Sequence, residues 1–183
     1  MEKLGLYKID PERPTLKKAT EGSACFDVSY WPTKLNNPST VGFQGYIYEA
    51  VTGYDDNNKP LKRLIDNVTG SIIIMPNERL LIPTSIIMDI PTGYSVRIHP
   101  RSGFSFKTGC NLINGEGVID WDYIDEVYIP LVNNSDQRVR IEPGERIAQA
   151  ELVQMVDYKT TNKKLPPEKK TDREGGLGST GTK

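Results

Sequence analysis

Residues 71–100 read SIIIMPNERLLIPTSIIMDIPTGYSVRIHP, and the spacing of their prolines indicates the fold class. Runs of strand length rich in apolar residues recur along this stretch, at 72–75, 79–82, 85–90 and 94–98, and a proline follows each run within two residues. Proline lacks the N–H that a β-ladder needs, so each proline is expected to end a strand. Further runs of this kind occupy residues 3–9, 24–30, 127–132, 139–141 and 147–156. Short strands at this spacing predict an all-β barrel or sandwich.

Residues 33–70 interrupt the pattern. This segment is rich in Gly, Asn, Asp and Tyr, and it holds a turn signal, DDNN, at residues 55–58. Residues 46–48 (YIY) and 61–65 (LKRLI) flank that signal, which predicts a β-hairpin.

The composition excludes several kinds of site. The 183 residues carry 23 Lys and Arg against 24 Asp and Glu, which is not the positive excess typical of nucleic-acid surfaces. The single histidine, His99, excludes a two-histidine metal site within one chain. Cys25 and Cys110 show no CxxC spacing, which excludes a four-thiolate zinc site and a disulfide framework. We interpret His99 and both cysteines as structural.

The first residues, MEKLGLYKIDPERP, lack the apolar run of a signal peptide, and the apolar runs elsewhere are too short to cross a membrane. We therefore expect an intracellular, soluble protein, cytoplasmic if it is encoded by a bacterium or a phage. Neither a nucleic acid nor a membrane is expected as a partner.

Four short segments carry groups suited to recognition or catalysis. Residues 100–103 (PRSG) offer a guanidinium, a hydroxyl and a glycine that admits close backbone approach, which together suit a phosphate. A helical turn can follow them. Residues 114–123 (NGEGVIDWDY) place two carboxylates two positions apart, where one could serve as a general base or a Mg²⁺ ligand. Residues 143–149 (PGERIAQ) and 24–27 (ACFD) set polar side chains into apolar strands. Each segment also has a purely structural interpretation. Residues 100–103 could form a surface turn, and residues 114–123 a polar loop. Arg146 could pair with a carboxylate, and Asp27 could cap a neighbouring turn.

The segment from residue 157 onward differs in composition. It carries several lysines, two prolines at 166–167 and a glycine-rich end at 173–181 (REGGLGSTG). Such a segment buries little apolar surface and is expected to be mobile in isolation. Successive glycines leave backbone N–H groups able to wrap an anion.

Taken in order, these five motifs resemble those of the homotrimeric dUTP pyrophosphatase (dUTPase) family, over residues 1–31 and about 71–183. The resemblance implies an all-β, β-barrel or jelly-roll fold that forms a homotrimer. It implies a β domain over residues 1–156 and a flexible C-terminal arm over 157–183 that closes over the active site. The implied activity is Mg²⁺-dependent hydrolysis of dUTP to dUMP and pyrophosphate, which keeps uracil out of DNA and supplies dUMP for dTTP synthesis.

The resemblance also implies a role for individual residues. Asp120 would activate the attacking water, and Asp27 would reach the Mg²⁺ ion through water. Tyr123 would lie under the deoxyribose and leave no room for a 2′-hydroxyl. The other implied substrate-binding residues are Asn114, Gly117, Val118 and Ile119 for the uracil, Arg101, Ser102, Gly103 and Gln149 for the phosphates, and Arg173, Leu177, Gly178, Ser179 and Thr180 in the arm.

The sequence departs from the family pattern in three regions. The arm motif is one residue shorter than usual, and Leu177 stands where an aromatic residue would stack on the uracil. Residues 124–126 (IDE) replace the usual turn after Tyr123, and residues 33–70 form an insertion without a counterpart. The insertion could bind a protein partner.

These departures leave alternatives open. One is a regulatory or interaction module that binds dUTP with little turnover, and another is a structural jelly-roll protein. A third is a relative of dCTP deaminase, but the position expected to hold its glutamate falls near Pro130, where no acid stands.

Overall fold

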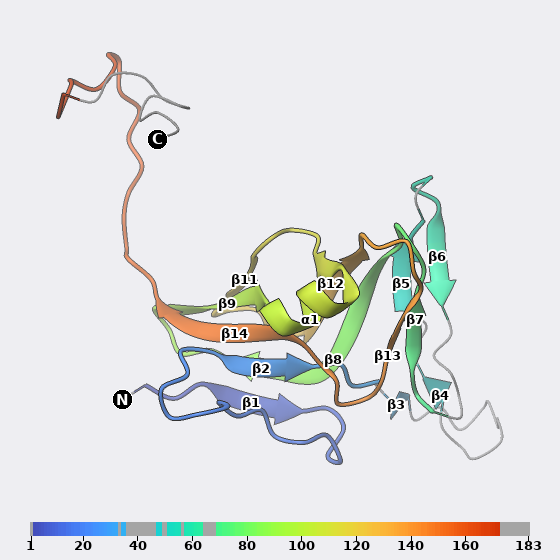
Figure 1. The fold of residues 1–183 in the computed structure, drawn as a ribbon. Coiled ribbons are helices and arrows are strands. Elements are labelled where there is room, and N and C mark those ends of the chain that lie inside the picture. Colours follow the sequence, from blue (N-terminus) through green and yellow to red (C-terminus); the bar gives the residue numbers. More distant parts are fainter. Residues whose placement is uncertain are drawn as a thin grey trace.

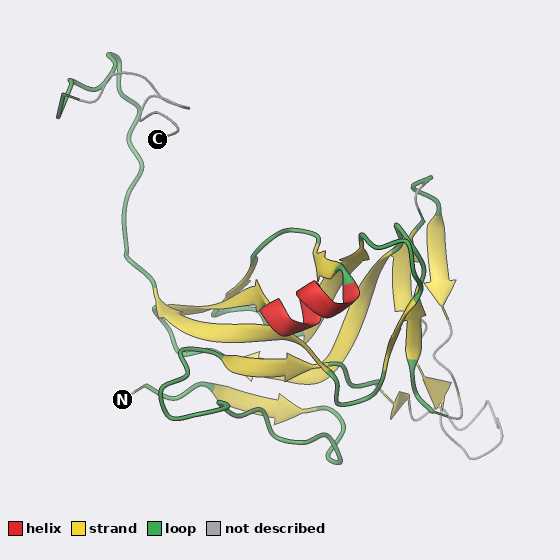
Figure 2. Ribbon diagram, in the orientation of Figure 1, coloured by secondary structure: helices red, strands yellow, loops and turns green. Residues whose placement is uncertain are grey.

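A computed structural model describes residues 2–32, 34–35, 47–48, 51–55, 57–63 and 69–172. This part of the chain is almost all strand, with one short helix (Figure 2). The elements are β1 (Gly5–Lys8), β2 (Phe26–Ser29), β3 (Lys34–Leu35), β4 (Ile47–Tyr48), β5 (Val51–Tyr54), β6 (Pro60–Arg63), β7 (Ile72–Ile74), β8 (Arg79–Asp89), β9 (Tyr94–Pro100), α1 (Ser102–Thr108), β10 (Cys110–Leu112), β11 (Gly117–Asp120), β12 (Glu126–Asn133), β13 (Val139–Ile141) and β14 (Arg146–Gln154).

Two antiparallel sheets form the body of the molecule (Figure 1). The larger sheet has the order β10-β12-β8-β5-β6, with β1 also paired to β8. The smaller sheet has the order β11-β9-β14-β2. Two-stranded pairs, β13 with β7 and β3 with β4, complete the described strands. The non-consecutive neighbours in both sheets are typical of a jelly roll, so the all-β prediction is confirmed.

The hydrophobic core joins the inner faces of the two sheets. Strand β12 shows why, because its side chains alternate and place Val127, Ile129 and Leu131 in the core. Val96 and Ile98 of β9 belong to the same buried cluster. Each such side chain contributes about 1.5–3 kcal/mol to folding, so this cluster holds the sheets in fixed relation.

One strand prediction is wrong. The sequence predicts that a strand ends before Pro83 and another begins at Ser85, but β8 runs through both residues. The strand bends there, with Ser85 at φ 55°. The buried Glu126 carboxylate accepts hydrogen bonds from the backbone N–H groups of Thr84 (3.1 Å) and Ser85 (2.6 Å). A side chain distant in sequence thus satisfies donors that the bend removes from the ladder.

The predicted hairpin exists, with a different first strand. Strands β5 and β6 pair in a register that sets Tyr54 opposite Pro60, and the Asp55 N–H donates to the Lys59 carbonyl (3.1 Å) at the end of the pair. Residues 47–48 of the predicted first strand form β4 instead, which pairs with β3, while residues 46, 64 and 65 lie outside the described residues. The hairpin continues the larger sheet because Gly53 of β5 lies opposite Leu80 of β8. A Cβ on Gly53 would lie 2.1 Å from the Arg79 carbonyl oxygen, so no larger residue fits this strand pairing.

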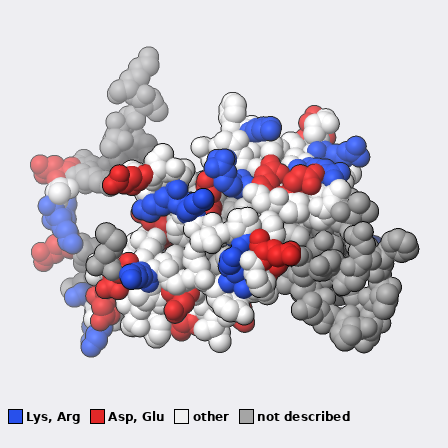
Figure 3. Space-filling model, turned by 90° about the horizontal axis from the view of Figure 1, so that it is seen from below, with Lys and Arg blue, Asp and Glu red and all other residues white. Residues whose placement is uncertain are grey.

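Residues 155–172 contain no helix or strand and lead away from the body, on the side opposite β5 and β6 (Figure 1). On the face seen in Figure 3, basic and acidic side chains are interspersed, in line with the near-neutral composition. Among the described residues, α1 is far too short to cross a membrane.

Candidate active site

A pocket of about 430 Å³ opens beside β11. Its apolar wall comes from β8, β9 and β12, and its polar side comes from β11 and the turns on either side of that strand. The lining residues are Leu81, Ile98, Leu112, Asn114, Gly117, Val118, Ile119, Asp120, Asp122, Tyr123, Val127, Tyr128 and Pro130. All six residues that the sequence assigns to base, sugar and water therefore lie around one cavity.

The entrance turn to β11 depends on glycine. Gly115 adopts φ 71°, a left-handed conformation that glycine tolerates without strain. Its N–H donates to the Leu112 carbonyl (3.2 Å), which closes the turn and places Asn114 at the pocket. A Cβ on Gly117 would lie 3.1 Å from the Ile98 Cβ and 3.7 Å from the Asn114 Nδ2. A side chain at Gly117 would therefore press on Ile98 in the pocket wall, while its contact with the Asn114 amide would be of ordinary length.

The exit turn positions two carboxylates and a tyrosine. Asp120 ends β11, and the Tyr123 N–H donates to the Asp120 carbonyl (3.1 Å). The two carboxylates that the sequence places two positions apart, Asp120 and Asp122, both line the pocket. The turn after β11 brings the two carboxylates to the pocket, because Asp122 lies beyond the end of the strand.

Tyr123 is held at its hydroxyl, which donates to the Glu126 carbonyl (2.9 Å). Burial, together with the nearby Asp125 and Glu126 carboxylates, raises the pKa of the Tyr123 phenol. The hydroxyl therefore remains a donor at neutral pH, and the ring keeps one edge anchored. The sequence did not single out Glu126 or the pocket residue Tyr128. An acid at the start of the apolar run 127–132 was the available signal for Glu126.

A second cluster of predicted residues lies outside this pocket. The Asp27 carboxylate accepts a hydrogen bond from Arg101 Nε at Oδ1 (3.0 Å) and one from Arg146 Nη1 at Oδ2 (2.9 Å). The Asp27 side chain is only 19% exposed and Arg101 is also partly buried, whereas the Arg146 side chain is 55% exposed. Gln149 donates from Nε2 to the Pro100 carbonyl (3.0 Å), which fixes the end of β9. We call Asp27, Arg101, Arg146 and Gln149 the arginine cluster.

The predicted helical turn is α1, which begins directly after Arg101. Ser102 and Gly103 form its first turn and are exposed beside the arginine cluster. The buried Phe104 anchors the helix to the core, and Gly109 ends it at φ 74°. The arginine–carboxylate pair that was the structural alternative for Arg146 is present.

The pocket and the arginine cluster are far apart on one chain. Asp120 lies opposite Ser95 in the β11–β9 pairing, whereas Arg101 follows the far end of β9, six residues along. At the rise of an extended strand this separation is about 20 Å. No residue of the arginine cluster lines the pocket. The predicted arm residues, Arg173, Leu177, Gly178, Ser179 and Thr180, lie outside the described residues.

A family model described as dUTPase matches residues 67–181. The chain belongs to the dUTPase family. A deoxyuridine 5′-triphosphate nucleotidohydrolase from Finegoldia magna is 40% identical over 153 residues, which is 81% of this chain and 94% of the relative. Another of that name, from Brucella melitensis, is 44% identical over 111 residues, 61% of this chain and 70% of the relative.

Solved dUTPase structures show the same fold at low identity. The dUTPase of Staphylococcus bacteriophage 80alpha with dUPNHPP has a TM-score of 0.69 and 19% identity, and the match covers 99% of both chains. The dUTPase of phage phi11 of S. aureus, described with a species-specific insert, has a TM-score of 0.62 and 15% identity over 90% of this chain and 97% of the other. The predictions of the dUTPase family and its all-β jelly-roll fold are thus confirmed.

Proposed function

We propose that this chain hydrolyses dUTP to dUMP and pyrophosphate. The proposal is carried by one observation: Asn114, Asp120 and Tyr123 border a single cavity whose remaining wall is mostly apolar. A pocket of this kind buries a flat base and leaves a few polar groups to select it. The name of the curated relatives, deoxyuridine 5′-triphosphate nucleotidohydrolase, supports the same substrate.

Selection of the nucleoside would rest on the pocket. The Asn114 amide offers both a donor and an acceptor to the uracil edge, aided by backbone groups of Gly117, Val118 and Ile119. A cytosine would leave some of these groups unpaired, which is costly in a buried site. The Tyr123 ring would pack against the deoxyribose, and its anchored position would exclude a 2′-hydroxyl.

Asp120 would act as the general base. Its exposed carboxylate lies at the rim of the pocket, where a water molecule can reach it. Abstraction of a proton from that water would create the nucleophile for attack on the phosphate chain. Asp122 also lines the pocket and provides an internal comparison for this role.

Phosphate binding would fall to the arginine cluster of another copy of the chain. Arg101, Ser102, Gly103 and Gln149 would bind the triphosphate, but within one chain Arg101 lies about 20 Å from Asp120 along β9. A triphosphate linked to a nucleoside in the pocket of one chain therefore requires the cluster of a neighbour. A homotrimer with sites between subunits meets that requirement.

Asp27 is the residue of the arginine cluster that would hold a Mg²⁺ ion. A carboxylate is a hard oxygen donor of the kind that Mg²⁺ prefers, but each Asp27 oxygen already accepts a hydrogen bond from an arginine. Asp27 would therefore hold the ion through bound water. Bound Mg²⁺ would neutralise charge on the triphosphate, while the arginines orient the chain for in-line attack.

The C-terminal arm, 157–183, would close over the occupied site, and residues 1–156 would form the β domain. Residues 157–172 extend from the end of the smaller sheet, which gives the arm the reach to cover a neighbouring subunit (Figure 1). Arg173, Ser179 and Thr180 would hold the terminal phosphate, while Leu177 and Gly178 would cover the uracil. The insertion at 33–70 would remain available to a protein partner at the edge of the larger sheet.

The deciding experiment measures pyrophosphate release with Mg²⁺ from dUTP, with dCTP, dTTP and UTP in parallel. Release from dUTP alone supports the proposal. Tight binding of dUTP without release would replace it with the regulatory binding module. Ammonia release from dCTP would indicate a deaminase. The glutamate expected of a deaminase would lie near Pro130 in β12, whereas the carboxylates that line the pocket, Asp120 and Asp122, both lie outside that strand.

A further inference from the structure

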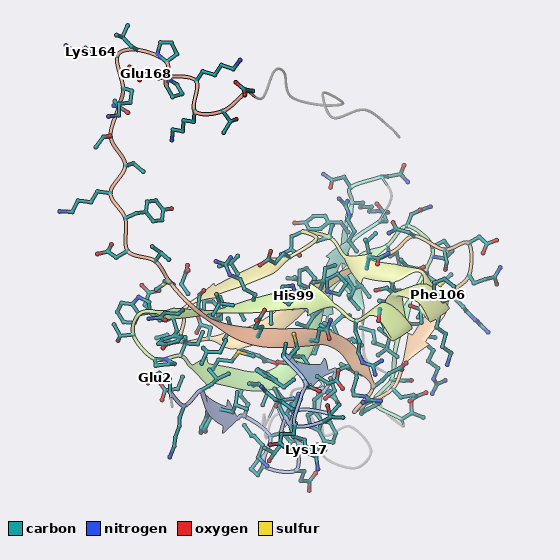
Figure 4. All side chains as sticks on the ribbon, turned by 60° about the vertical axis from the view of Figure 1, so that its left-hand side comes forward. Glu2, Lys17, His99, Phe106, Lys164 and Glu168 are labelled. Atoms are coloured by element: carbon teal, nitrogen blue, oxygen red, sulfur yellow. The ribbon has the colours of Figure 1, made fainter. Side chains whose placement is uncertain are left out.

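Three side chains with metal-binding atoms meet on the outer face of the smaller sheet. Cys25 directly precedes β2, His99 lies in β9, and Glu151 lies in β14. One ligand atom from each, the cysteine sulfur, a histidine ring nitrogen and a carboxylate oxygen, lies within 4.8 Å of the other two. Figure 4 shows His99 on the part of the sheet where β9 runs beside β14.

The pairing of the strands explains why these side chains meet. Gln149 of β14 lies opposite Asp27 on one side and opposite His99 on the other. Side chains at alternate positions of a strand share a face, so Glu151 lies on the same face as Gln149. Cys25 lies two residues before Asp27, which brings its sulfur to Glu151 across the β2–β14 pairing.

The histidine has an unsatisfied atom at this place. His99 Nε2 is buried and has no hydrogen-bond partner among the described residues, and it lies 3.6 Å from Glu151 Oε2. Nitrogen and oxygen ligands of a tetrahedral zinc ion lie about 3.4 Å apart, given bond lengths near 2.1 Å. The observed separation is thus nearly that of two ligands of one ion, whereas it is too long for a hydrogen bond.

We propose that Cys25, His99 and Glu151 form a zinc-binding site. A thiolate and a carboxylate balance the charge of a divalent ion, and neutral imidazole supplies the third ligand. The soft sulfur favours zinc over Mg²⁺, which prefers oxygen ligands. Binding would release the thiol proton to solvent. The three protein ligands leave a fourth position for water.

The site has a direct structural connection to the arginine cluster. Cys25 lies two residues from Asp27, His99 two residues from Arg101, and Glu151 two residues from Gln149. An ion bound by all three ligands would therefore tie β2, β9 and β14 together immediately beside the arginine cluster. None of the three ligands lines the pocket of the same chain, so we assign the ion a structural role, in which it would restrain the strands that carry the arginine cluster.

The test uses the full chain, reduced and freed of metal with a chelator. Isothermal titration with Zn²⁺ is expected to show one ion bound per chain, and excess Mg²⁺ should not displace it. Titration with Co²⁺ should produce a thiolate-to-cobalt charge-transfer band in the near ultraviolet. Zn²⁺ should also raise the temperature of thermal unfolding, because it binds the folded state.

Matched variants assign the ligands. C25S and E151Q are expected to weaken Zn²⁺ binding at least about tenfold, since even changes beyond the ligands commonly cost that much. H99Q should have the same effect. C110S is the control, because Cys110 is the other free cysteine and is buried beside α1. C110S should keep both the affinity and the charge-transfer band.

Two results would overturn the proposal. The first is the absence of a charge-transfer band in the wild-type chain with Co²⁺, which needs no variant to fold. The second is unchanged Zn²⁺ affinity in C25S, which would show that the cysteine is not a ligand and that Cys25, His99 and Glu151 do not form one site. Neither result depends on dUTP hydrolysis, so the zinc site and the proposed activity are tested separately.

Discussion

Arg101 Nε lies 3.0 Å from Asp27 Oδ1, which ties the turn after β9 to a strand 74 residues earlier in the chain. Arg146 Nη1 contacts the other oxygen of the same carboxylate at 2.9 Å, from a position 119 residues later than Asp27. One aspartate thus sets the position of two arginines, one in the turn after β9 and one in β14. We expect the arginine cluster to lose its arrangement when this charge is removed.

Asp27→Asn is therefore expected to lower kcat/KM for dUTP about a hundredfold, the scale of a displacement of about 1 Å in a positioning group. Steady-state pyrophosphate release measures the effect. Glu142→Gln is the control, because Glu142 also pairs with an arginine but is half exposed and lies outside the cluster. Equal kinetics for Asp27→Asn and the wild type would contradict the assigned role.

Asp120→Asn should reduce kcat by about a hundredfold to ten-thousandfold, the range for loss of a general base. Affinity for the nonhydrolysable analogue dUPNHPP with Mg²⁺ should change little, because the amide preserves the shape of the side chain. Asp122→Asn, in the same pocket, is the comparison and should retain most turnover. If Asp122→Asn were inactive and Asp120→Asn active, the general base would be Asp122 and not Asp120.

The separation of Asp120 from Arg101 predicts complementation between inactive chains. Asp120→Asn and Arg101→Ala should each be inactive alone. Co-expression should restore about a quarter of wild-type activity, because in random mixtures of the proposed homotrimer one site in four combines an intact Asp120 with an intact Arg101 of a neighbour. No recovery in trimers shown to be mixed would mean that both residues act from one chain.

Tyr123→Phe removes the hydrogen bond to the Glu126 carbonyl and keeps the ring. A bond of this kind contributes about 1 kcal/mol, so preference for dUTP over UTP should fall about fivefold as the ring loses its anchor. Tyr123→Ala should abolish most of the preference. Competition between the two nucleotides measures the ratio, and an unchanged ratio in the Ala variant would remove Tyr123 from sugar selection.

Glu126→Ala should lower the free energy of unfolding by about 2–4 kcal/mol, because it leaves the N–H groups of Thr84 and Ser85 buried without an acceptor. Glu126→Gln retains an oxygen and should cost about 1 kcal/mol. Urea denaturation of the full chain gives both values. A loss in the Ala variant no larger than in the Gln variant would show that the bend in β8 does not depend on this carboxylate.

Much of the fold could be predicted from the sequence because its signals are local. Prolines and apolar runs marked β9, β12 and β13 within a residue or two, and their alternation decided which side chains enter the core. Pro83 misled the prediction because the partner that rescues its strand, Glu126, lies more than 40 residues away. Pairing of the insertion was also beyond local signals, since β5 joins the sheet through β8.

The sequence by itself determined the chemistry of the site: which residue types are present, in what order, and which family they identify. Only the tertiary structure decided which of them meet. It gathered Asn114, Asp120 and Tyr123 at one pocket, placed Arg101 on Asp27 about 20 Å away along β9, and brought Cys25 to His99 and Glu151. The physical reason is that strand register is set by packing of the whole core, so contacts between distant strands carry no local signal in the chain.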